Sequence, residues 1–377
     1  MKSLKIACGL VCFLVLASNV WSMSHWNEAR GVYDDVCYLR QAHLFQRFGL
    51  AGFNTDISRD DDGYLAGKLK EIGFPTASNV KTAPCHTPMP ASGRLVIQYP
   101  PGTGAALALF PQGHQVIPLY VLATAVVFAV AVLAISRAAV ASEVLLAGVF
   151  GCLAIYLMIN PAKASYSMAP TMVVCALAGY LTARWLIGQR QSTLLMLSLG
   201  VLLGLSVNFR LPNLFLSAGY DLFLLGAFLS TRTMQAALQG LWFAIAFLAG
   251  MTPTLIANAI NAGSPLATTY GGPDVAPPDF SLGIVWQYVA DMQFVLLVLA
   301  VLAAGFLLSM RSRAGIGSVA LLTAVNLVVN LAFFLSHPVF TPYYTVPIAM
   351  LSLWSLLFGY LLRPAEAVDG ALVTRAA

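Results

Sequence analysis

The sequence predicts an all-α polytopic membrane protein with about ten transmembrane helices and a large first extracytoplasmic loop that carries interfacial helices. Of its 377 residues, 59% are apolar and only 9% are charged, whereas an ordinary soluble domain carries about 25% charged residues. A soluble fold of this size could not cover its surface with so few charges. The composition therefore excludes a cytosolic enzyme, a nucleic-acid-binding protein and a disordered chain.

Ten apolar runs of roughly the length that a helix needs to cross a bilayer follow one another along the chain. The segment 22–115, between the first run and the second, holds eight of the 20 basic and eight of the 15 acidic residues. We therefore expect a first transmembrane helix in 1–21, an extracytoplasmic loop with juxtamembrane helices in 22–115, a bundle of about nine helices in 116–363 and a cytoplasmic tail in 364–377. The expected spans are 4–21, 116–135, 143–159, 168–187, 193–209, 212–230, 236–260, 283–309, 317–336 and 343–362.

Basic residues in the short loops predict the orientation, because cytoplasmic loops carry an excess of Lys and Arg. Only Lys163 and Arg210 fall on the side of the long loop, outside that loop itself. Both termini are therefore expected in the cytoplasm and the long loop on the far side. The ten basic residues on the cytoplasmic side are Lys2, Lys5, Arg137, Arg184, Arg190, Arg232, Arg311, Arg313, Arg363 and Arg375.

The N-terminal run fits two interpretations. Two lysines, an apolar stretch and a small residue at Ser22 are also the pattern of a cleavable signal peptide. We expect a retained anchor; cleavage would leave nine spans and the same far-side loop.

The long loop begins with an acidic pair, Asp34 and Asp35, before an amphipathic stretch over 36–45 that predicts a helix. Adjacent carboxylates repel each other unless a cation or a donor compensates, and such a pair suits a general base or a metal ligand. The alternative is a solvated helix N-terminus, where acidic residues are favoured in any case. A short helix is expected over 64–72, and the proline-rich segment 75–93 predicts irregular structure.

The loop ends with Tyr99-Pro100-Pro101-Gly102, followed by an apolar hexamer over 105–110 that is too short to span and predicts an interfacial helix. Prolines favour an extended turn here, and glycine lets another backbone approach closely. Cys37 and Cys85 both lie in this loop. They would pair in an oxidising compartment and stay thiols otherwise, and the sequence leaves this open.

One span, a far-side acidic pair, interfacial helices, and Tyr-Pro-Pro-Gly leading into a many-span bundle resemble the GT-C superfamily of membrane glycosyltransferases. The branch with protein mannosyltransferases and lipid A aminoarabinose transferases is the most similar. Gly204-Leu205, followed by Arg210 at the end of the fifth span, adds a short motif. The architectural resemblance covers most of the chain, although 377 residues is short for that branch.

The resemblance implies an inverting transfer of a hexosyl or pentosyl group from a polyprenyl-phosphate-linked sugar to an extracytoplasmic acceptor, which is a glycolipid, polysaccharide or protein. It implies a multi-pass location in the inner (plasma) membrane, with the active site on the periplasmic face. A first-loop Asp is the general base: we lean to Asp35, with Asp34 as its partner or as the ligand of a divalent cation, Mg²⁺ or Mn²⁺. The expected phosphate-binding residues are Arg210, Lys163 and His337, and the expected cavity residues are Tyr99, Tyr343 and Tyr344.

Three other functions remain open at this point. A secondary transporter would place its polar residues near mid-membrane, where Asp221 is the main candidate, and Asp291 falls near the start of the eighth span. A non-catalytic assembly protein would not need the acidic pair. An O-antigen ligase-like enzyme would carry its main polar loop late in the chain. No phosphate-binding loop, nucleophile elbow or zinc motif occurs in the sequence.

Overall fold

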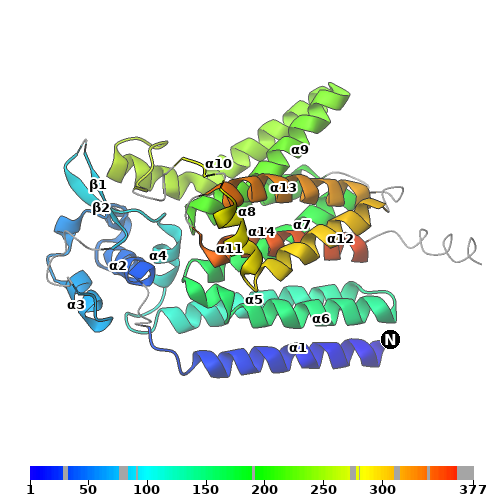
Figure 1. The fold of residues 1–377 in the computed structure, drawn as a ribbon, viewed down its shortest axis with the longest axis horizontal. Coiled ribbons are helices and arrows are strands. Elements are labelled where there is room, and N and C mark those ends of the chain that lie inside the picture. The colour runs from blue at the N-terminus through cyan, green and yellow to red at the C-terminus, as the bar shows by residue number, and fades with distance from the viewer. Residues whose placement is uncertain are drawn as a thin grey trace, which may run out of the picture.

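The computed structural model describes residues 1–28, 33–75, 84–90, 92–188, 192–271, 277–279, 281–309, 315–337 and 340–362. A bundle of long helices fills most of the molecule, and a smaller region of short helices and a β-hairpin covers one end of it (Figure 1). The expected tail 364–377, with Arg375, and the basic residues Arg190, Arg311, Arg313 and Arg363 lie outside the described residues.

Seven helices in the described part of the chain are long and apolar enough to cross a membrane. They are α1 (Lys2–Met23), α5 (Val116–Arg137), α6 (Ala141–Leu157, extended by the 3-10 turn Pro161–Ala164), α7 (Met168–Ile187), α9 (Phe215–Thr231, preceded by the 3-10 turn Leu211–Leu214), α10 (Met234–Ala262) and α13 (Ile316–Ser336). The expectation of an all-helical polytopic membrane protein is confirmed at this level.

Two further apolar helices are shorter: α8 (Thr193–Val207) and α14 (Val346–Leu361). At 1.5 Å per residue they extend about 22 and 24 Å, less than the roughly 30 Å of a hydrocarbon core. Both short helices pack closely against longer ones that are candidate spans: α8 lies along α10, and α14 lies along α7. A Cβ on Gly204 of α8 would collide with the carbonyl oxygen of Phe247 on α10, so this crossing requires glycine.

The expected span 283–309 is not one straight helix. It is divided into α11 (Leu282–Ala290) and α12 (Phe294–Ser309), which meet at 92°. Asp291 lies at the break, where its Oδ1 accepts a hydrogen bond from the backbone N–H of Gln293 at 2.8 Å. A carboxylate that accepts an N–H at a helix start favours a new helix at this point. A single Asp inside a long apolar run was not enough to predict the break from the sequence.

Helix α1 packs against α5 and α6 as part of the bundle. The Asn19 side chain, 1% exposed, donates from Nδ2 to the Ile155 carbonyl oxygen at 2.6 Å. Cys8 and Cys12 lie against Gly148 and Gly151 of α6. These contacts fit a retained helix.

The region between α1 and α5 contains α2 (Tyr33–Phe48), two 3-10 turns (Gly49–Phe53 and Ile57–Arg59), α3 (Tyr64–Glu71), β1 (His86–Met89), β2 (Arg94–Ile97) and α4 (Gly102–Leu107). The predicted helices over 36–45 and 64–72 correspond to α2 and α3, and the hexamer over 105–110 overlaps α4. The antiparallel hairpin of β1 and β2 corrects the prediction of irregular structure over 75–93. Each strand has only four residues, and neither alternates between buried and exposed positions, so the proline-rich segment carried no strand signal.

Buried side chains of α2 join this region to the bundle in one hydrophobic core, because Tyr38, Leu39 and Ala42 pack with residues of the long helices. The Tyr-Pro-Pro-Gly turn strengthens the junction. Gly102 donates its backbone N–H to the Asn208 carbonyl oxygen at 2.7 Å, and a Cβ on Gly102 would meet the same backbone. The predicted close approach at this glycine is confirmed, and it fixes the start of α4 against the end of α8.

Candidate functional site

A polar cavity of about 270 Å³ lies at the junction of the loop region and the bundle. Its walls come from the start of α2, the hairpin, the turns that precede α7 and α9, and the turn Pro342–Tyr344 before α14. The described lining residues are Tyr33, Asp34, Tyr38, Pro84, Cys85, Gln98, Tyr99, Ser165, Arg210, Pro212, Tyr270, Thr341, Tyr343 and Tyr344. Five residues expected at a site from the sequence therefore share one cavity: Asp34, Tyr99, Arg210, Tyr343 and Tyr344.

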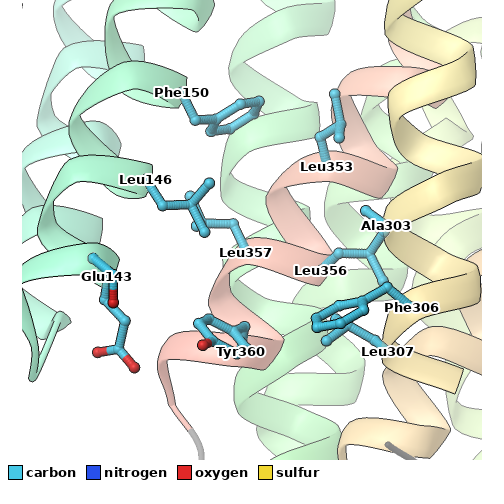
Figure 2. Close-up of a pocket in the computed structure, with 11 residues that line it drawn as sticks. Glu143, Leu146, Phe150, Ala303, Phe306, Leu307, Leu353, Leu356, Leu357 and Tyr360 are labelled. Atoms are coloured by element: carbon cyan, nitrogen blue, oxygen red, sulfur yellow. The ribbon is translucent and has the colours of Figure 1, made fainter. Parts of the chain in front are cut away.

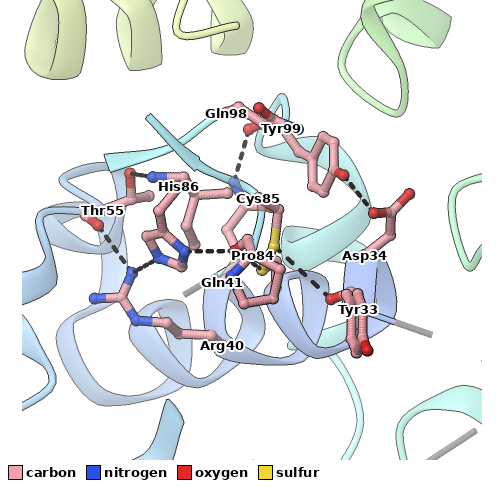
Figure 3. The surroundings of a disulfide bond; sticks show 12 residues. Tyr33, Asp34, Arg40, Gln41, Thr55, Pro84, Cys85, His86, Gln98 and Tyr99 are labelled. Carbon is pink, nitrogen blue, oxygen red and sulfur yellow. Dashed lines mark hydrogen bonds between the residues drawn. A yellow bond between two sulfur atoms is a disulfide. The ribbon is translucent and has the colours of Figure 1, made fainter. Parts of the chain in front are cut away.

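Asp34 is the one acidic residue among the described residues that line this cavity. It lies in the first turn of α2, where the helix dipole favours a negative charge. The Tyr99 hydroxyl donates to Asp34 Oδ1 at 2.5 Å (Figure 3). Burial, and then the neighbouring charge of Asp34, raise the pKa of Tyr99 far above its usual range. The phenol therefore stays protonated and remains a hydrogen-bond donor to the carboxylate.

Tyr99 is held firmly in place. Its ring stacks on Tyr38 at a centroid distance of 5.0 Å, and its carbonyl oxygen accepts from Gln41 Nε2 at 3.1 Å. Both contacts come from α2, the helix that carries Asp34. The Tyr99 hydroxyl is therefore positioned by the same helix that carries its acceptor, Asp34. The geometry of this hydrogen bond depends little on the rest of the loop.

Asp35 has a different environment from its neighbour. Its side chain is 1% exposed, and Oδ1 accepts the backbone N–H of Tyr166 at 3.0 Å. Successive residues of a helix point about 100° apart, so Asp34 faces the cavity while Asp35 faces the segment before α7. Asp35 thus links α2 to the bundle through a buried hydrogen bond, and it is not among the described residues that line the cavity.

Arg210 supplies the positive charge of the cavity lining. The side chain is 6% exposed, and its guanidinium lies 4.8 Å from the ring centroids of both Tyr343 and Tyr344. Nη1 contacts the Met168 sulfur at 2.9 Å. Among the described residues, no carboxylate lies within ion-pair distance of this guanidinium. Aromatic faces attract a cation but do not neutralise it.

Lys163 and His337 are not among the described lining residues. Lys163 Nζ lies 5.1 Å from the ring centroid of Trp26. His337 is 8% exposed and stacks on Phe333 at 5.5 Å. Asp221 is also remote: it borders a groove between α9 and α10.

Several cavity residues were not expected from the sequence. Tyr38 follows Asp34 by four residues, which places both on one face of a helix, and this spacing was an available signal. Tyr270 lies 6.0 Å from Tyr99 between ring centroids. It comes from the segment 261–282, and Thr269 beside it donates to the Gln98 carbonyl oxygen at 2.9 Å. Such a contact between distant segments leaves no local pattern.

A disulfide joins Cys37 of α2 to Cys85 beside β1 (Figure 3). The sequence had left this pairing open. Cys85 lines the cavity and accepts at its carbonyl oxygen the backbone N–H of Gln98 at 2.9 Å. The bond therefore connects the helix of Asp34 to the start of the hairpin, and the Gln98 hydrogen bond continues this connection to the residue before Tyr99.

A buried arginine stabilises the outer side of the same junction. Arg40, fully buried, donates to the carbonyl oxygens of Thr55 and Asp56 at 2.9 Å each, and its Nε lies 3.6 Å from Asp60 Oδ1. His86 Nε2 lies 3.0 Å from Arg40 Nη1, while Nδ1 lies 2.8 Å from the Pro84 carbonyl oxygen. Nδ1 therefore donates and Nε2 accepts. Burial, and then the Arg40 charge, lower the pKa of His86 to about 4.

The described residues offer little to a resident metal ion. Cys37, Cys85 and His86 lie close enough together for ligation, but the two sulfurs are bonded to each other and the imidazole faces Arg40. In the cavity, Asp34 provides one carboxylate, whereas Mg²⁺ takes six oxygen ligands. A divalent cation would depend on substrate and water oxygens, and its binding by Asp34 stays a prediction.

No model of a known protein family matches the chain, and no curated protein shows a significant match to it.

Proposed function

We propose that this protein is a membrane glycosyltransferase of GT-C type. It transfers a sugar from a polyprenyl phosphate to an extracytoplasmic acceptor, with Asp34 as general base and Arg210 as the group that receives the phosphate. One observation carries the proposal. A buried guanidinium with no carboxylate within ion-pair distance, among the described residues, shares a tyrosine-lined cavity with a single carboxylate.

The environment of Arg210 favours an anionic ligand. Removing a guanidinium from water is costly unless a partner compensates, and the described contacts of Arg210 are aromatic rings and a thioether. A phosphate oxygen in the cavity would supply that partner through a charge-assisted hydrogen bond. One positive lining charge matches the single negative charge of a polyprenyl-phosphate sugar.

Asp34 is suited to accept a proton. Tyr99 occupies Oδ1, which leaves Oδ2 for the acceptor hydroxyl. In the proposed step, the acceptor oxygen bonds to the anomeric carbon as the bond from that carbon to the phosphate oxygen breaks. The hydroxyl proton passes to Asp34, the bonding pair leaves with the phosphate, and Arg210 stabilises its charge. Attack opposite to the leaving group inverts the anomeric centre.

Other cavity features support a sugar as the transferred group. Tyr33, Tyr38, Tyr99, Tyr270 and Tyr343 offer rings for the apolar face of a pyranose, and hydroxyl groups for hydrogen bonds. The disulfide favours an oxidising compartment, so we assign the cavity to the periplasmic or extracytoplasmic face. This assignment agrees with the distribution of basic residues between the short loops.

The proposal exchanges the roles that the sequence favoured for the acidic pair. Asp35 becomes the structural partner, because Tyr166 occupies its buried carboxylate, and Asp34 becomes the base. Lys163 and His337 are left out of the phosphate site, since both lie outside the described lining.

The test uses the full-length protein in lipid vesicles with polyprenyl-phosphate sugars and a membrane glycolipid acceptor. Product and released polyprenyl phosphate are measured for wild type, Asp34→Asn and Asp35→Asn. Loss of a general base predicts that Asp34→Asn lowers kcat by about 10²–10⁴-fold with an unchanged melting temperature. Asp35→Asn, the matched control, is expected to lower the melting temperature while the folded fraction keeps its kcat.

A further variant examines the phosphate site. Arg210→Gln is expected to weaken donor binding and to lower kcat, since the charge acts on the leaving group. Full transfer activity in Asp34→Asn and Arg210→Gln, measured in folded protein, would rule out the assignment. Donor-independent movement of a solute across the vesicle membrane would favour a transporter instead.

A further inference from the structure

A second cavity, of about 280 Å³, lies between α6, α12 and α14 (Figure 2). It is at the opposite end of the bundle from the polar cavity. Helix α14 begins two residues after Tyr344, which lines the polar cavity, and ends one residue after Tyr360, which lines the second one. The two sites are therefore about 24 Å apart along that helix.

Polar and apolar groups are segregated along this second cavity. Ser142, Glu143 and Tyr360 lie where α6 begins and α14 ends. Phe150 and Leu353 lie about two turns further into the bundle, and the remaining lining is aliphatic or aromatic. A ligand that fits this arrangement has an alkyl chain and a polar head.

The cavity opens on the outer surface of the bundle. Two of its lining side chains are largely exposed there, Leu146 at 50% and Phe306 at 57%. Since α6 and α12 belong to candidate membrane spans, this surface faces hydrocarbon rather than water. An apolar groove in such a position is filled from the bilayer.

The head-binding end contains charges of both signs. Glu143 Oε2 accepts the backbone N–H groups of Ala139 at 2.6 Å and Val140 at 3.3 Å, which fixes the carboxylate at the polar end. Arg137 ends α5, two residues before Ala139. Lys5 Nζ donates to the Ser136 carbonyl oxygen at 2.8 Å, so a second cation lies at the same end. Glu143 lines the polar end of the cavity, and the two cations lie at the same end of the neighbouring helices α1 and α5; together these charges complement a zwitterion with an ammonium group and a phosphate.

We propose that this cavity binds one acyl chain of an ethanolamine-type phospholipid from the leaflet opposite to the polar cavity. The ammonium group meets Glu143, and the phosphate lies toward Lys5 and Arg137. The bound chain fills the space between α6 and the pair α12 and α14, and so holds these helices together. This site is independent of the proposed glycosyl transfer, because none of its residues lines the polar cavity.

Native mass spectrometry of the delipidated full-length protein, titrated with phospholipids of identical chains, tests the proposal. Phosphatidylethanolamine, phosphatidylcholine and phosphatidylglycerol are compared, each with wild type and three variants. Ala303→Trp places a large side chain in the cavity. Leu302→Trp makes the same change one residue away, at a 63% exposed position that does not line the cavity. Glu143→Gln keeps an acceptor for the two N–H groups and removes the charge.

We expect wild type to bind one phosphatidylethanolamine about tenfold more tightly than the other two lipids, a difference of about 1.4 kcal/mol. Ala303→Trp abolishes this binding and Leu302→Trp leaves it unchanged. Glu143→Gln retains lipid binding but loses the preference for ethanolamine. Equal affinity for all three lipids in wild type, or equal loss in both Trp variants, would overturn the proposal. Displacement of the bound lipid by polyprenyl phosphate would also overturn it, because the cavity would then belong to the carrier chain.

Discussion

Removing the disulfide between Cys37 and Cys85 is expected to open the wall of the polar cavity while the bundle stays folded. The bond closes a loop of 48 residues, and the chain-entropy relation gives about 4 kcal/mol for a loop of that length. Since 1.4 kcal/mol corresponds to a tenfold change in an equilibrium constant, the open population of this loop should rise by up to about a thousandfold. Cys85 has a left-handed backbone conformation, with φ of +55°, which is uncommon for a non-glycine residue.

Hydrogen exchange measures this opening directly. A background in which the four thiols Cys8, Cys12, Cys152 and Cys175 are replaced by Ala removes the free thiols that could exchange with the disulfide, so that reduction can be compared with the double Ser variant. Amides of β1, β2 and the first turns of α2 should lose protection in Cys37→Ser/Cys85→Ser, whereas amides of α7 and α14 should not change. Transfer activity should fall with the protection, because the bond ties the helix of Asp34 to Cys85, whose carbonyl oxygen holds the backbone N–H of Gln98, next to Tyr99.

Unchanged exchange in β1 and β2 after reduction would refute this reasoning, since it would mean that packing alone holds the hairpin. Loss of protection throughout the bundle would refute it in another way, because the loop would then not open independently.

The remaining predictions concern single residues. The pKa of His86 in the folded loop, about 4, lies below its ordinary value of 6.5. Between pH 4 and pH 6.5 the unfolded loop therefore binds more protons than the folded loop. Stability of the loop should be complete above pH 6.5 and fall by up to about 3 kcal/mol toward pH 4, and His86→Gln should flatten this dependence in pH-dependent melting curves. Asp221→Leu should raise the melting temperature in lipid, because a central intramembrane Asp costs about 2.5–3.5 kcal/mol on insertion scales; an unchanged or lower value would indicate a partner for the carboxylate. Gly204→Leu should cost at least about 1–3 kcal/mol, through its collision with the Phe247 carbonyl on α10. Gly226→Ala, where a Cβ meets nothing within 4 Å, should change thermal stability little.

The sequence predicted the helical membrane architecture well because long apolar runs carry a strong signal. It could not predict details that depend on contacts between distant segments. The break at Asp291 lies inside an apolar run, and the hairpin in 75–93 depends on pairing with 94–97 and on the disulfide. Both features required the three-dimensional structure.

The site residues show the same limit. The sequence predicts that five residues lie on one side of the membrane, and this was enough to group them. The structure brings all five to one cavity: Asp34, Tyr99, Arg210, Tyr343 and Tyr344. Their roles in catalysis stay predictions. Sidedness could not distinguish Asp34 from Asp35, since that choice depends on the rotation of α2 about its axis. It also could not separate Arg210 from Lys163, because two cations on one side of a membrane can still face different neighbours.

The 92° turn between α11 and α12 has a mechanical consequence. Because α11 meets the apolar helix α12 at 92° and presents Leu282 and Trp286 outward, at 81% and 71% exposed, we expect α11 to lie along the bilayer surface. Its other face carries Tyr288, whose hydroxyl lies 3.4 Å from the carbonyl oxygen of Thr341, a residue of the polar cavity. The rim of that cavity is thus joined to α11, the helix that we expect at the depth of the lipid head groups. We therefore expect bilayer thickness to influence the width of the cavity, and Trp286 fluorescence in bilayers of different thickness would measure that coupling.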